Sequence, residues 1–529
     1  MHVVIADSLS SSAIDILRSV PGWTVDARPH RSASELARDL ADADALIVRS
    51  ATQVDAALIA AAPRLRVIAR AGTGVDNVHV PSATDRGIVV MNAPGANSVS
   101  VAEHAWALML ALARSVGAAD AAMKRGVWDK KRLTGAELRG KTLGVVGLGR
   151  IGQEVTNRAR AFGMHVLAHD PFISEQVAAT MGAELVTLDD LCARSDYITL
   201  HIPATAETRQ LFDATRFAAC KQGVRIINTA RGELIDEAAL AAAITRGHVG
   251  GAGLDVFVQE PPPDQTLVGL PQVVATPHIA ASTVEAQELV GLETAMAVRD
   301  FLRDGAIRNA VNFPALPAEE QTRLRPWMKL ADRLGTLLVQ SATGRTHGVG
   351  IRYYGAAVNA GSDLLASSVV SGVLRPILSG AVTVINARAV AAQRGIEIIE
   401  SRSSRPRDFA NLLSVKLLTS DGERWVEGTV LEHGSVRLTS IDGVEIEAPL
   451  EGTLILIKNQ DLPGVIGEVG TILGRSGVNI ANFALGRSDG GAVGMVNIDP
   501  PPTTDGSLER ALDAIRQIPA VKSVALVQF

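Results

Sequence analysis

The sequence is poor in cysteine. Its 529 residues include only Cys192 and Cys220, which are too few for a disulfide framework. Neither cysteine lies in a C-x-x-C motif or in a cluster with metal-ligand spacing. We therefore expect both to be buried apolar side chains, and we expect no metal site.

The sequence also lacks a strong excess of one charge and a long apolar run. Its 51 basic and 56 acidic residues give a formal net charge of -5, which offers no footprint for nucleic acid or for an anionic membrane surface. No apolar run reaches the roughly 18 residues that cross a bilayer. Residues 2–6 form a strand-like run with no basic leader before them. These absences predict a soluble, cytoplasmic protein with neither a nucleic-acid nor a membrane partner.

A glycine-rich loop is the most informative stretch that is present. Residues 142–152 read Thr-Leu-Gly-Val-Val-Gly-Leu-Gly-Arg-Ile-Gly, a short apolar run followed by a G-x-G-x-x-G loop that opens a helix at 151–162. Gly147 allows a tight turn, and Gly149 lets backbone N–H groups approach a diphosphate. Gly152 lets the new helix lie close to the strand. The loop therefore predicts a dinucleotide site.

An acid follows the next strand at the spacing that such sites use. The run 165–169 ends at Asp170, about 20 residues after the glycine loop, where dinucleotide-binding domains place the acid that accepts the ribose hydroxyls. Pro171 and Phe172 follow instead of an arginine, so a 2′-phosphate would meet a negative charge without compensation. The expected cofactor is therefore NAD rather than NADP.

The order of apolar runs predicts alternating strands and helices in the N-terminal part. The chain length is typical of three or four domains. Short β runs at 3–6, 45–49, 66–70 and 88–91 alternate with Ala-rich stretches, which favours a parallel, helix-covered sheet. The stretch 98–114 is apolar on nearly every face and is expected to be a buried helix, often one between subunits. Further strands are expected at 197–201, at 225–229 and in a run ending at Asp255, and a further helix at 282–304.

The C-terminal part changes character. A helix is expected at 319–341, followed by polar β segments with turns at 420–422 and 441–443. No catalytic constellation is visible in this stretch. Residues 453–529 read β-α-β-β-α-β, the element order of a ferredoxin-like sandwich.

Five motifs together carry a family resemblance. They are 70–77 (RAGTGVDN), 140–152 (GKTLGVVGLGRIG), 228–236 (NTARGELID), 253–257 (GLDVF, with Glu260-Pro) and 276–283 (TPHIAAST). With them the chain resembles the D-2-hydroxyacid dehydrogenases, most closely their long-form 3-phosphoglycerate dehydrogenase branch.

The resemblance implies an α/β fold with four domains. A Rossmann-type NAD-binding domain (97–283) is inserted in a flavodoxin-like substrate domain (1–96 and 284–314). An α+β intervening regulatory domain (315–451) and a ferredoxin-like ACT domain (452–529) follow. It further implies a homo-oligomer, either a dimer or a tetramer.

By this resemblance the catalytic residues are Arg231, Glu260 and His278. Reduction of a 2-oxo acid needs a cation that forks the carboxylate and polarises the carbonyl, which suits the planar guanidinium of Arg231. It also needs a proton donor, and His278 can supply the proton near neutral pH. A carboxylate such as Glu260 would favour protonated His278 and fix its orientation. The hydride belongs to the nicotinamide and need only be positioned.

The resemblance also implies contacts to the cofactor and to a phosphorylated substrate. Asp255 would hold the nicotinamide carboxamide. The full set of expected cofactor residues is Gly147, Gly149, Arg150, Ile151, Gly152, Asp170, Thr229, Ala230, Arg231, Asp255, His278, Ile279, Ala280 and Ala281. Arg49, Arg70 and, from a partner subunit, Arg132 are the expected phosphate ligands. Other histidines, His104 among them, are interpreted as packing or surface residues.

The last domain resembles a module that binds amino acids between paired copies. Asp461 begins a Leu-Pro-Gly loop, and Asn479 stands before the next strand, so a carboxylate and an amide could hold a zwitterion such as L-serine. Serine-responsive relatives usually carry His or Tyr just before the aspartate, where this chain has Asn459 and Gln460. The alternative is a dimerisation module without a ligand.

The function implied is NAD-dependent oxidation of 3-phospho-D-glycerate to 3-phosphooxypyruvate, the first step of L-serine synthesis, with serine as a feedback effector. One alternative keeps the chemistry with an unphosphorylated acid, as in hydroxypyruvate or glyoxylate reductases. Another is an NAD-sensing corepressor. Both lack the C-terminal extension that this chain has.

Overall fold

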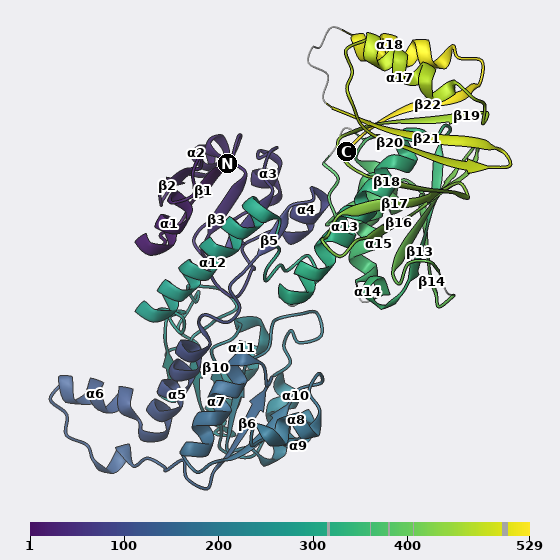
Figure 1. Ribbon diagram of the computed structural model, residues 1–529. Coiled ribbons are helices and arrows are strands. Elements are labelled where there is room, and N and C mark those ends of the chain that lie inside the picture. The colour runs from purple at the N-terminus through teal and green to yellow at the C-terminus, as the bar shows by residue number, and fades with distance from the viewer. Residues whose placement is uncertain (315–317, 360, 379–380, 406, 500–505) are drawn as a thin grey trace.

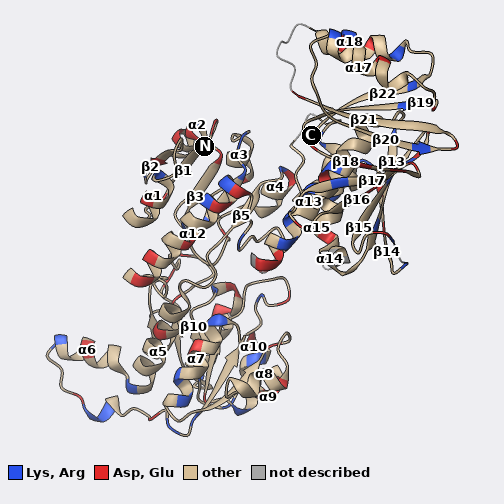
Figure 2. Ribbon diagram, viewed as in Figure 1, with Lys and Arg blue, Asp and Glu red and all other residues tan. Residues whose placement is uncertain are grey.

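The computed structural model describes residues 1–314, 318–359, 361–378, 381–405, 407–499 and 506–529. Figure 1 shows two α/β lobes, which we call lobe 1 (around the N-terminus) and lobe 2 (below it). The described residues from Ala318 to the C-terminus begin with α13 (Ala318–Ser341) and form a third part, which we call the C-terminal half. Basic and acidic residues are interspersed along all three parts (Figure 2). The proposed domain boundary at 314/315 falls at residues 315–317, which lie outside the described residues.

Lobe 1 is built on a five-stranded parallel sheet in the order β2-β1-β3-β4-β5. The strands are β1 (His2–Ile5), β2 (Thr24–Ala27), β3 (Ala45–Val48), β4 (Val67–Arg70) and β5 (Val89–Met91). The helices are α1 (Ser11–Arg18), α2 (Ala33–Asp39), α3 (Ala56–Ala60), α4 (Val80–Asp85) and, from later in the chain, α12 (Val284–Asp304). The sequence predicted every strand but β2, a half-exposed edge strand without a buried apolar run.

Lobe 2 is built on a seven-stranded parallel sheet in the order β12-β11-β10-β9-β6-β7-β8. Its strands are β6 (Thr142–Val146), β7 (His165–His169), β8 (Glu184–Leu185), β9 (Tyr197–Leu200), β10 (Val224–Asn228), β11 (Val249–Leu254) and β12 (Val273–Ala275). The order reverses at β6, between β7 and β9, and such a reversal opens a crevice at the carboxyl ends of the strands.

Helices cover both faces of this sheet. They are α5 (Ser98–Arg114), α7 (Arg150–Ala161), α8 (Glu175–Thr180), α9 (Leu188–Arg194), α10 (Ala214–Ala219), η2 (Gly232–Leu234) and α11 (Glu237–Thr245). The helices α6 (Val116–Lys124) and η1 (Lys131–Leu133), between α5 and β6, have no buried residue and project away from the sheet. The prediction for α5 was right to the residue, and nine of its residues are buried. Within the described ranges no single helix is long and apolar enough to cross a membrane, and only α5 with α6, bent by 67°, passes that test as a pair.

The C-terminal half begins with the long helix α13 (Ala318–Ser341) and a six-stranded mixed sheet in the order β14-β13-β15-β16-β17-β18. Its strands are β13 (Thr346–Tyr354), β14 (Glu397–Ser403), β15 (Leu412–Thr419), β16 (Gly422–Val430), β17 (Val436–Ile441) and β18 (Val444–Pro449). Helices α14 (Ala356–Asn359), α15 (Ser362–Leu374) and α16 (Ala387–Gln393) complete this part. Both expected hairpin turns are present, between β15 and β16 and between β17 and β18.

The chain ends in the ferredoxin-like unit that the sequence predicted. Its elements are β19 (Thr453–Asn459), α17 (Val465–Arg475), β20 (Ile480–Ser488), β21 (Gly491–Ile498), α18 (Ser507–Arg516) and β22 (Val521–Gln528). The antiparallel strands stand in the order β20-β21-β19-β22. We call this unit the terminal sandwich.

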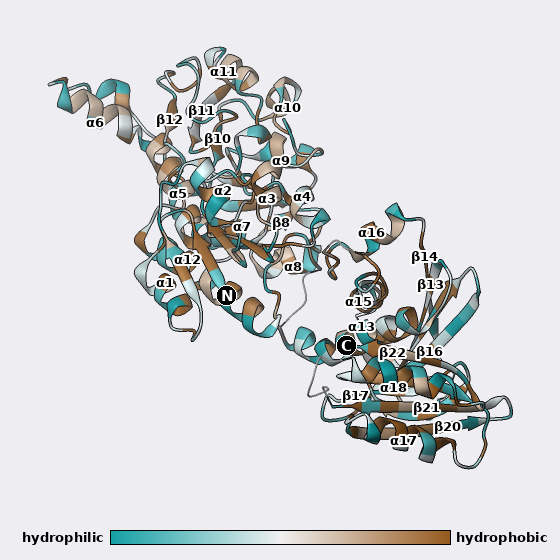
Figure 3. Ribbon diagram, turned by 90° about the horizontal axis from the view of Figure 1, so that it is seen from above, coloured by the Kyte–Doolittle hydropathy of each residue, from teal (hydrophilic) through white to brown (hydrophobic). Residues whose placement is uncertain are grey.

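The terminal sandwich shares a core with the region before it. One face of its sheet packs on α17 and α18. The other face contributes Leu454, Leu456, Met495 and Val527 to the core that also contains Leu334 of α13 and the middle sheet. Figure 3 shows the C-terminal elements gathered around α13. Burial of apolar surface is the main driving force of folding. Because the middle sheet, α13 and the terminal sandwich share one core, we expect them to fold as a single unit.

Candidate active site

The glycine loop lies at the carboxyl end of β6, beside the strand-order reversal of lobe 2. Gly147 has a φ of 92°, a left-handed conformation that favours glycine. A Cβ on Gly152 would lie 2.1 Å from the carbonyl oxygen of Gly147, so only glycine fits there. Next to Gly149 there is open space, and α7 begins at Arg150. Free backbone N–H groups and the helix dipole thus face open space, which suits a diphosphate.

Asp170 follows β7 and braces the glycine loop. Its Oδ2 accepts a hydrogen bond from the Leu148 N–H at 2.9 Å, and its Oδ1 accepts one from the Phe172 N–H at 2.9 Å. Each carboxylate oxygen has a second lone pair, so the group can still accept ribose hydroxyls. Further along the same edge, the buried Thr229 hydroxyl has no partner within the described part of the chain. These features fit a bound dinucleotide.

His278 and Glu260 form a hydrogen-bonded pair. The His278 Nδ1 lies 2.7 Å from the Glu260 Oε2, and both side chains are partly exposed. His278 has a φ of 53°, which is uncommon for a residue with a side chain and is typical of functional sites. The pairing leaves the His278 Nε2 as the ring nitrogen that can meet a substrate.

Asp255 fixes the backbone around His278. Its side chain is fully buried. It accepts hydrogen bonds from the Ile279 N–H (2.8 Å), the Ala280 N–H (2.8 Å) and the Thr276 hydroxyl (2.6 Å). Burial alone would raise the pKa of Asp255, but hydrogen bonds from His104, Thr276 and the two backbone groups outweigh burial and lower it. Asp255 is therefore an ionised group whose hydrogen bonds hold the loop that contains His278.

Arg231 follows β10 and reaches across to lobe 1. Its Nε and Nη2 donate to the Asp76 Oδ2 at 3.1 and 2.9 Å, and its Nη1 donates to the Ala230 carbonyl at 2.6 Å. A Cβ on Gly74 would lie 1.9 Å from the Arg231 Nη2, so the loop before Asp76 lies directly against the guanidinium. Asp76 was not predicted as a site residue, although it lies in the 70–77 motif.

Arg70 and Arg49 lie near Arg231, at the ends of β4 and β3. Burial lowers the pKa of Arg70, the nearby charges of Arg231 and Arg49 add to this effect, and Asp76 opposes it. The Nε of Arg70 is buried without a hydrogen-bond partner in the described structure. Three guanidinium groups whose charges meet around Arg70 form a site for a multiply charged anion.

Arg132 does not join this group within one subunit. It lies in η1, on the segment after α6 that projects from lobe 2 (Figure 1), and its side chain is 86% exposed. Its ion pair with Asp129, at 3.9 Å, is long and exposed, so it contributes little to stability.

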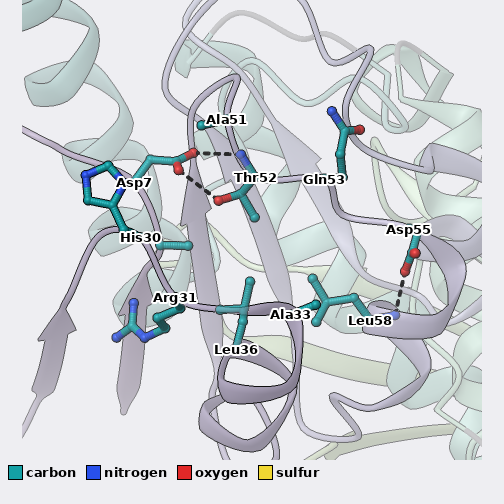
Figure 4. A pocket seen from close by; sticks show the side chains of 11 residues that line it. Asp7, His30, Arg31, Ala33, Leu36, Ala51, Thr52, Gln53, Asp55 and Leu58 are labelled. Atoms are coloured by element: carbon teal, nitrogen blue, oxygen red, sulfur yellow. Dashed lines mark hydrogen bonds between the residues drawn. The ribbon is translucent and has the colours of Figure 1, made fainter.

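Asp7, which was also missed, connects Arg49 to a separate cavity in lobe 1. The Arg49 N–H donates to the Asp7 Oδ2 at 2.5 Å, and the Thr52 hydroxyl donates to the Asp7 Oδ1 at 2.8 Å. Figure 4 shows Asp7 on the wall of this cavity, which has a volume of 320 Å³. Asp7 thus fixes the backbone from which Arg49 projects.

The three residues proposed for effector binding lie in the terminal sandwich but do not contact one another by any hydrogen bond in the described ranges. The Asn459 side chain is buried and donates to the Gln460 carbonyl at 2.7 Å. Asp461 is exposed, 3.5 Å from Arg487. Asn479 donates to Asp499 at 2.6 Å. Asp461 and Asn479 are accessible to a ligand, whereas the amide group of Asn459 is already engaged.

His104, interpreted from the sequence as a packing or surface residue, is largely buried and packs beside Asp255. Its Nε2 is 2.9 Å from the Thr276 hydroxyl and 3.3 Å from the Asp255 Oδ1. The two cysteines are buried, as expected. Among the described residues no group of three or more potential ligands could hold a metal ion.

Comparison with known protein families agrees with this geometry. Residues 106–280 match the D-isomer specific 2-hydroxyacid dehydrogenase, NAD binding domain. Residues 323–442 match the D-3-phosphoglycerate dehydrogenase intervening domain, and residues 453–520 match the ACT domain. Fold and site thus define an NAD-dependent dehydrogenase of the D-2-hydroxyacid class.

Individual relatives narrow the class. D-3-phosphoglycerate dehydrogenase of Methanocaldococcus jannaschii is 41% identical over 100% of both chains. The Bacillus subtilis protein of the same name is 39% identical over 92% of both chains. The solved D-lactate dehydrogenase of Aquifex aeolicus, complexed with NAD and lactic acid, has a TM-score of 0.52 and 29% identity; it covers 60% of this chain and 100% of its own. The chain belongs to the D-3-phosphoglycerate dehydrogenase family, which confirms the resemblance seen in its motifs.

Proposed function

We propose that this protein oxidises 3-phospho-D-glycerate to 3-phosphooxypyruvate with NAD, the first step of L-serine synthesis. The observation that carries the proposal is the His278–Glu260 pair, at 2.7 Å, beyond the carboxyl ends of the sheet whose strands also precede Arg231 and the glycine loop. Family membership supports the same substrate. The proposed location is the cytoplasm.

In the proposed reaction His278 is the general base. Its Nδ1–H donates to Glu260, so the lone pair of Nε2 is free to take the proton of the C2 hydroxyl. Glu260 stabilises the imidazolium that forms and holds the ring in place. Arg231 binds the substrate carboxylate in competition with Asp76. Bound NAD supplies the hydride acceptor.

Arg49 and Arg70 are proposed to bind the phosphate, because the charges of both Arg49 and Arg231 act on Arg70, which makes the three a group of neighbouring cations. Arg132 is proposed to act on the site of a partner subunit. In support, the projecting segment around α6 exposes Met123 (55%) and Trp128 (74%), apolar side chains that an oligomer would cover. We infer a homo-oligomer, a dimer or a tetramer, on this ground.

Cofactor contacts are proposed as the family suggests. The glycine-loop set (Gly147, Gly149, Arg150, Ile151, Gly152) takes the diphosphate, Asp170 the ribose, and Asp255 with residues 229–231 and 278–281 the nicotinamide. Asp461, Asn479 and, less directly, Asn459 are proposed to bind L-serine between paired terminal sandwiches. The exposure of Asp461 supports this.

The test is NADH oxidation with a panel of 2-oxo acids: 3-phosphooxypyruvate, hydroxypyruvate, pyruvate and 2-oxoglutarate. We expect the highest kcat/KM for 3-phosphooxypyruvate, since only its phosphate uses the extra arginines. A preference for hydroxypyruvate or another unphosphorylated acid would overturn the substrate assignment but would leave the dehydrogenase chemistry standing.

A further inference from the structure

The helix α5 combines an apolar surface with a polar edge at its N-terminal end. Asn97, Ser100 and His104 are spaced three and four residues apart, so they lie along one side of the helix. The Asn97 and Ser100 side chains are buried, and His104 is 18% exposed. Buried polar groups are stable only with hydrogen-bond partners, so the partners show what this edge does.

Two of those partners flank the loop that carries His278. The Ser100 hydroxyl lies 2.8 Å from the Thr283 hydroxyl, and the His104 Nε2 lies 2.9 Å from the Thr276 hydroxyl. Residues 276–283 are therefore held to one side of α5 at both ends. The third contact reaches lobe 1, because the Thr73 hydroxyl donates to the Asn97 Oδ1 at 2.9 Å. The same side of α5 thus touches the loop that lies against Arg231.

The contact of His104 has a defined direction. An ionised carboxylate only accepts hydrogen bonds, so the Thr276 hydroxyl donates to the Asp255 Oδ1 at 2.6 Å. The oxygen of Thr276 then accepts from His104, which requires a proton on Nε2. The result is a chain from His104 through Thr276 to Asp255, and Asp255 in turn holds the N–H groups of Ile279 and Ala280.

We propose that His104 is a positioning residue for the dehydrogenase reaction. It orients Thr276 and Asp255, and through them the backbone that keeps His278 at its unusual φ of 53° and in contact with Glu260. The rate of proton transfer depends on the position of the reacting group to within fractions of an ångström. Loss of the support from His104 should therefore slow proton transfer more than it weakens substrate binding. This inference rests on the proposed role of His278.

The test compares three histidine variants of the full chain. His104→Leu removes the donor, whereas His104→Gln keeps an N–H at the reach of Nε2. His248→Leu is the matched control, because His248 is also half-buried in lobe 2 and donates one hydrogen bond, to the Cys220 carbonyl at 3.0 Å. For each variant we would measure kcat, KM, NADH binding, the pH–rate profile and Tm.

We expect His104→Leu to lower kcat by about 10- to 100-fold, the usual effect of a small misplacement at a reacting centre. KM for the 2-oxo acid should change little, so the defect should appear in kcat. His104→Gln should restore most of the rate. His248→Leu should lower Tm without changing kcat.

Three results would overturn the proposal: wild-type kcat in His104→Leu, equal defects in the Leu and Gln variants, or an equal loss of rate in the control His248→Leu at a similar fall in Tm. If His104→Leu does not fold, Thr276→Val removes the hydroxyl between His104 and Asp255 with a side chain of similar shape and leaves only their direct contact at 3.3 Å, so a smaller loss of kcat in the same direction is expected. His278→Ala is measured alongside, on whichever 2-oxo acid the wild type reduces. Normal turnover in that variant would show that the proposed function is at fault, and not the role of His104.

Discussion

The two lobes and the C-terminal half hold their polar residues in different ways. In the lobes, contacts at the site join residues far apart in sequence: Arg231 and Asp76 are separated by 155 positions, and His104 and Thr276 by 172. In the terminal sandwich, Asn459 bonds to the residue after it, and Asn479 to a residue 20 positions away. The first arrangement is a site fixed by the fold. In the second arrangement the proposed effector residues do not contact one another, so only a bound effector would connect them.

Of the substitutions that test this contrast, His278→Ala is expected to change turnover most. If the catalytic group is preorganised in lobe 2, its loss should slow turnover by about 10²- to 10⁴-fold, the usual contribution of a positioned general base. NADH binding, measured by fluorescence, should stay near the wild-type value. Near-normal turnover would remove His278 from the mechanism.

The shared core of the C-terminal half predicts the next largest effect. A chain that ends at Ala448 loses the terminal sandwich and exposes the apolar residues around Leu334 and Leu438, which are buried in the shared core. Each such side chain stabilises the fold by roughly 1.5–3 kcal/mol when buried. We expect the shortened chain to aggregate, or its remaining C-terminal residues to lose their cooperative unfolding transition. Calorimetry measures this transition. An unchanged unfolding transition would show that the two parts are independent.

Glu260→Gln tests the pair within the site. The amide keeps the size of the side chain but removes the charge that stabilises the imidazolium formed when His278 takes the substrate proton. The kcat of oxidation should fall by about tenfold or more, since a hydrogen bond to a charged group contributes about 1.5–3 kcal/mol. Initial rates of NAD reduction at saturating substrate measure this. An unchanged kcat would mean that His278 does not depend on the charge of Glu260.

Asp170→Ala is expected to have a smaller effect, on cofactor choice. Removal of the carboxylate removes its repulsion toward a 2′-phosphate, worth on the order of 1 kcal/mol for charges about 4 Å apart in water. The ratio of kcat/KM with NAD to that with NADP should therefore fall by about tenfold at most. Asp189→Ala, at an exposed acid of α9, is the control. A fixed ratio would place ribose recognition elsewhere.

The smallest effect is expected in the C-terminal half. Asp461→Ala should raise the L-serine concentration for half-inhibition by roughly tenfold, since hydrogen bonds to a charged group contribute about 1.5–3 kcal/mol. Turnover without serine should not change. Asp489→Ala, an exposed acid in the same unit, is the matched control. Equal serine responses in the wild type and both variants would remove Asp461 from the effector site.

The same contrast explains what the sequence could predict. Periodicity and turn residues are local, so helix α5, strand β7 and the hairpin turns were predicted correctly. The family resemblance of the motifs predicted Arg231, Glu260 and His278 as the catalytic residues, and the structure brings the last two into contact. Asp76 and His104 were missed because their partners lie more than a hundred positions away, and no local pattern shows such a pairing. The shared core of α13 and the terminal sandwich was missed for the same reason.

The central claim is that the two lobes carry the chemistry and the C-terminal half carries its control. The most direct test compares the full chain with a chain of residues 1–314, in NADH-dependent reduction of 3-phosphooxypyruvate with and without millimolar L-serine. The solved D-lactate dehydrogenase of Aquifex aeolicus covers 60% of this chain over its full length, which is about the share that the two lobes make up. We predict that the shortened chain keeps a kcat of the same order and no longer responds to serine. Loss of activity, or persistent inhibition by serine, would contradict this division.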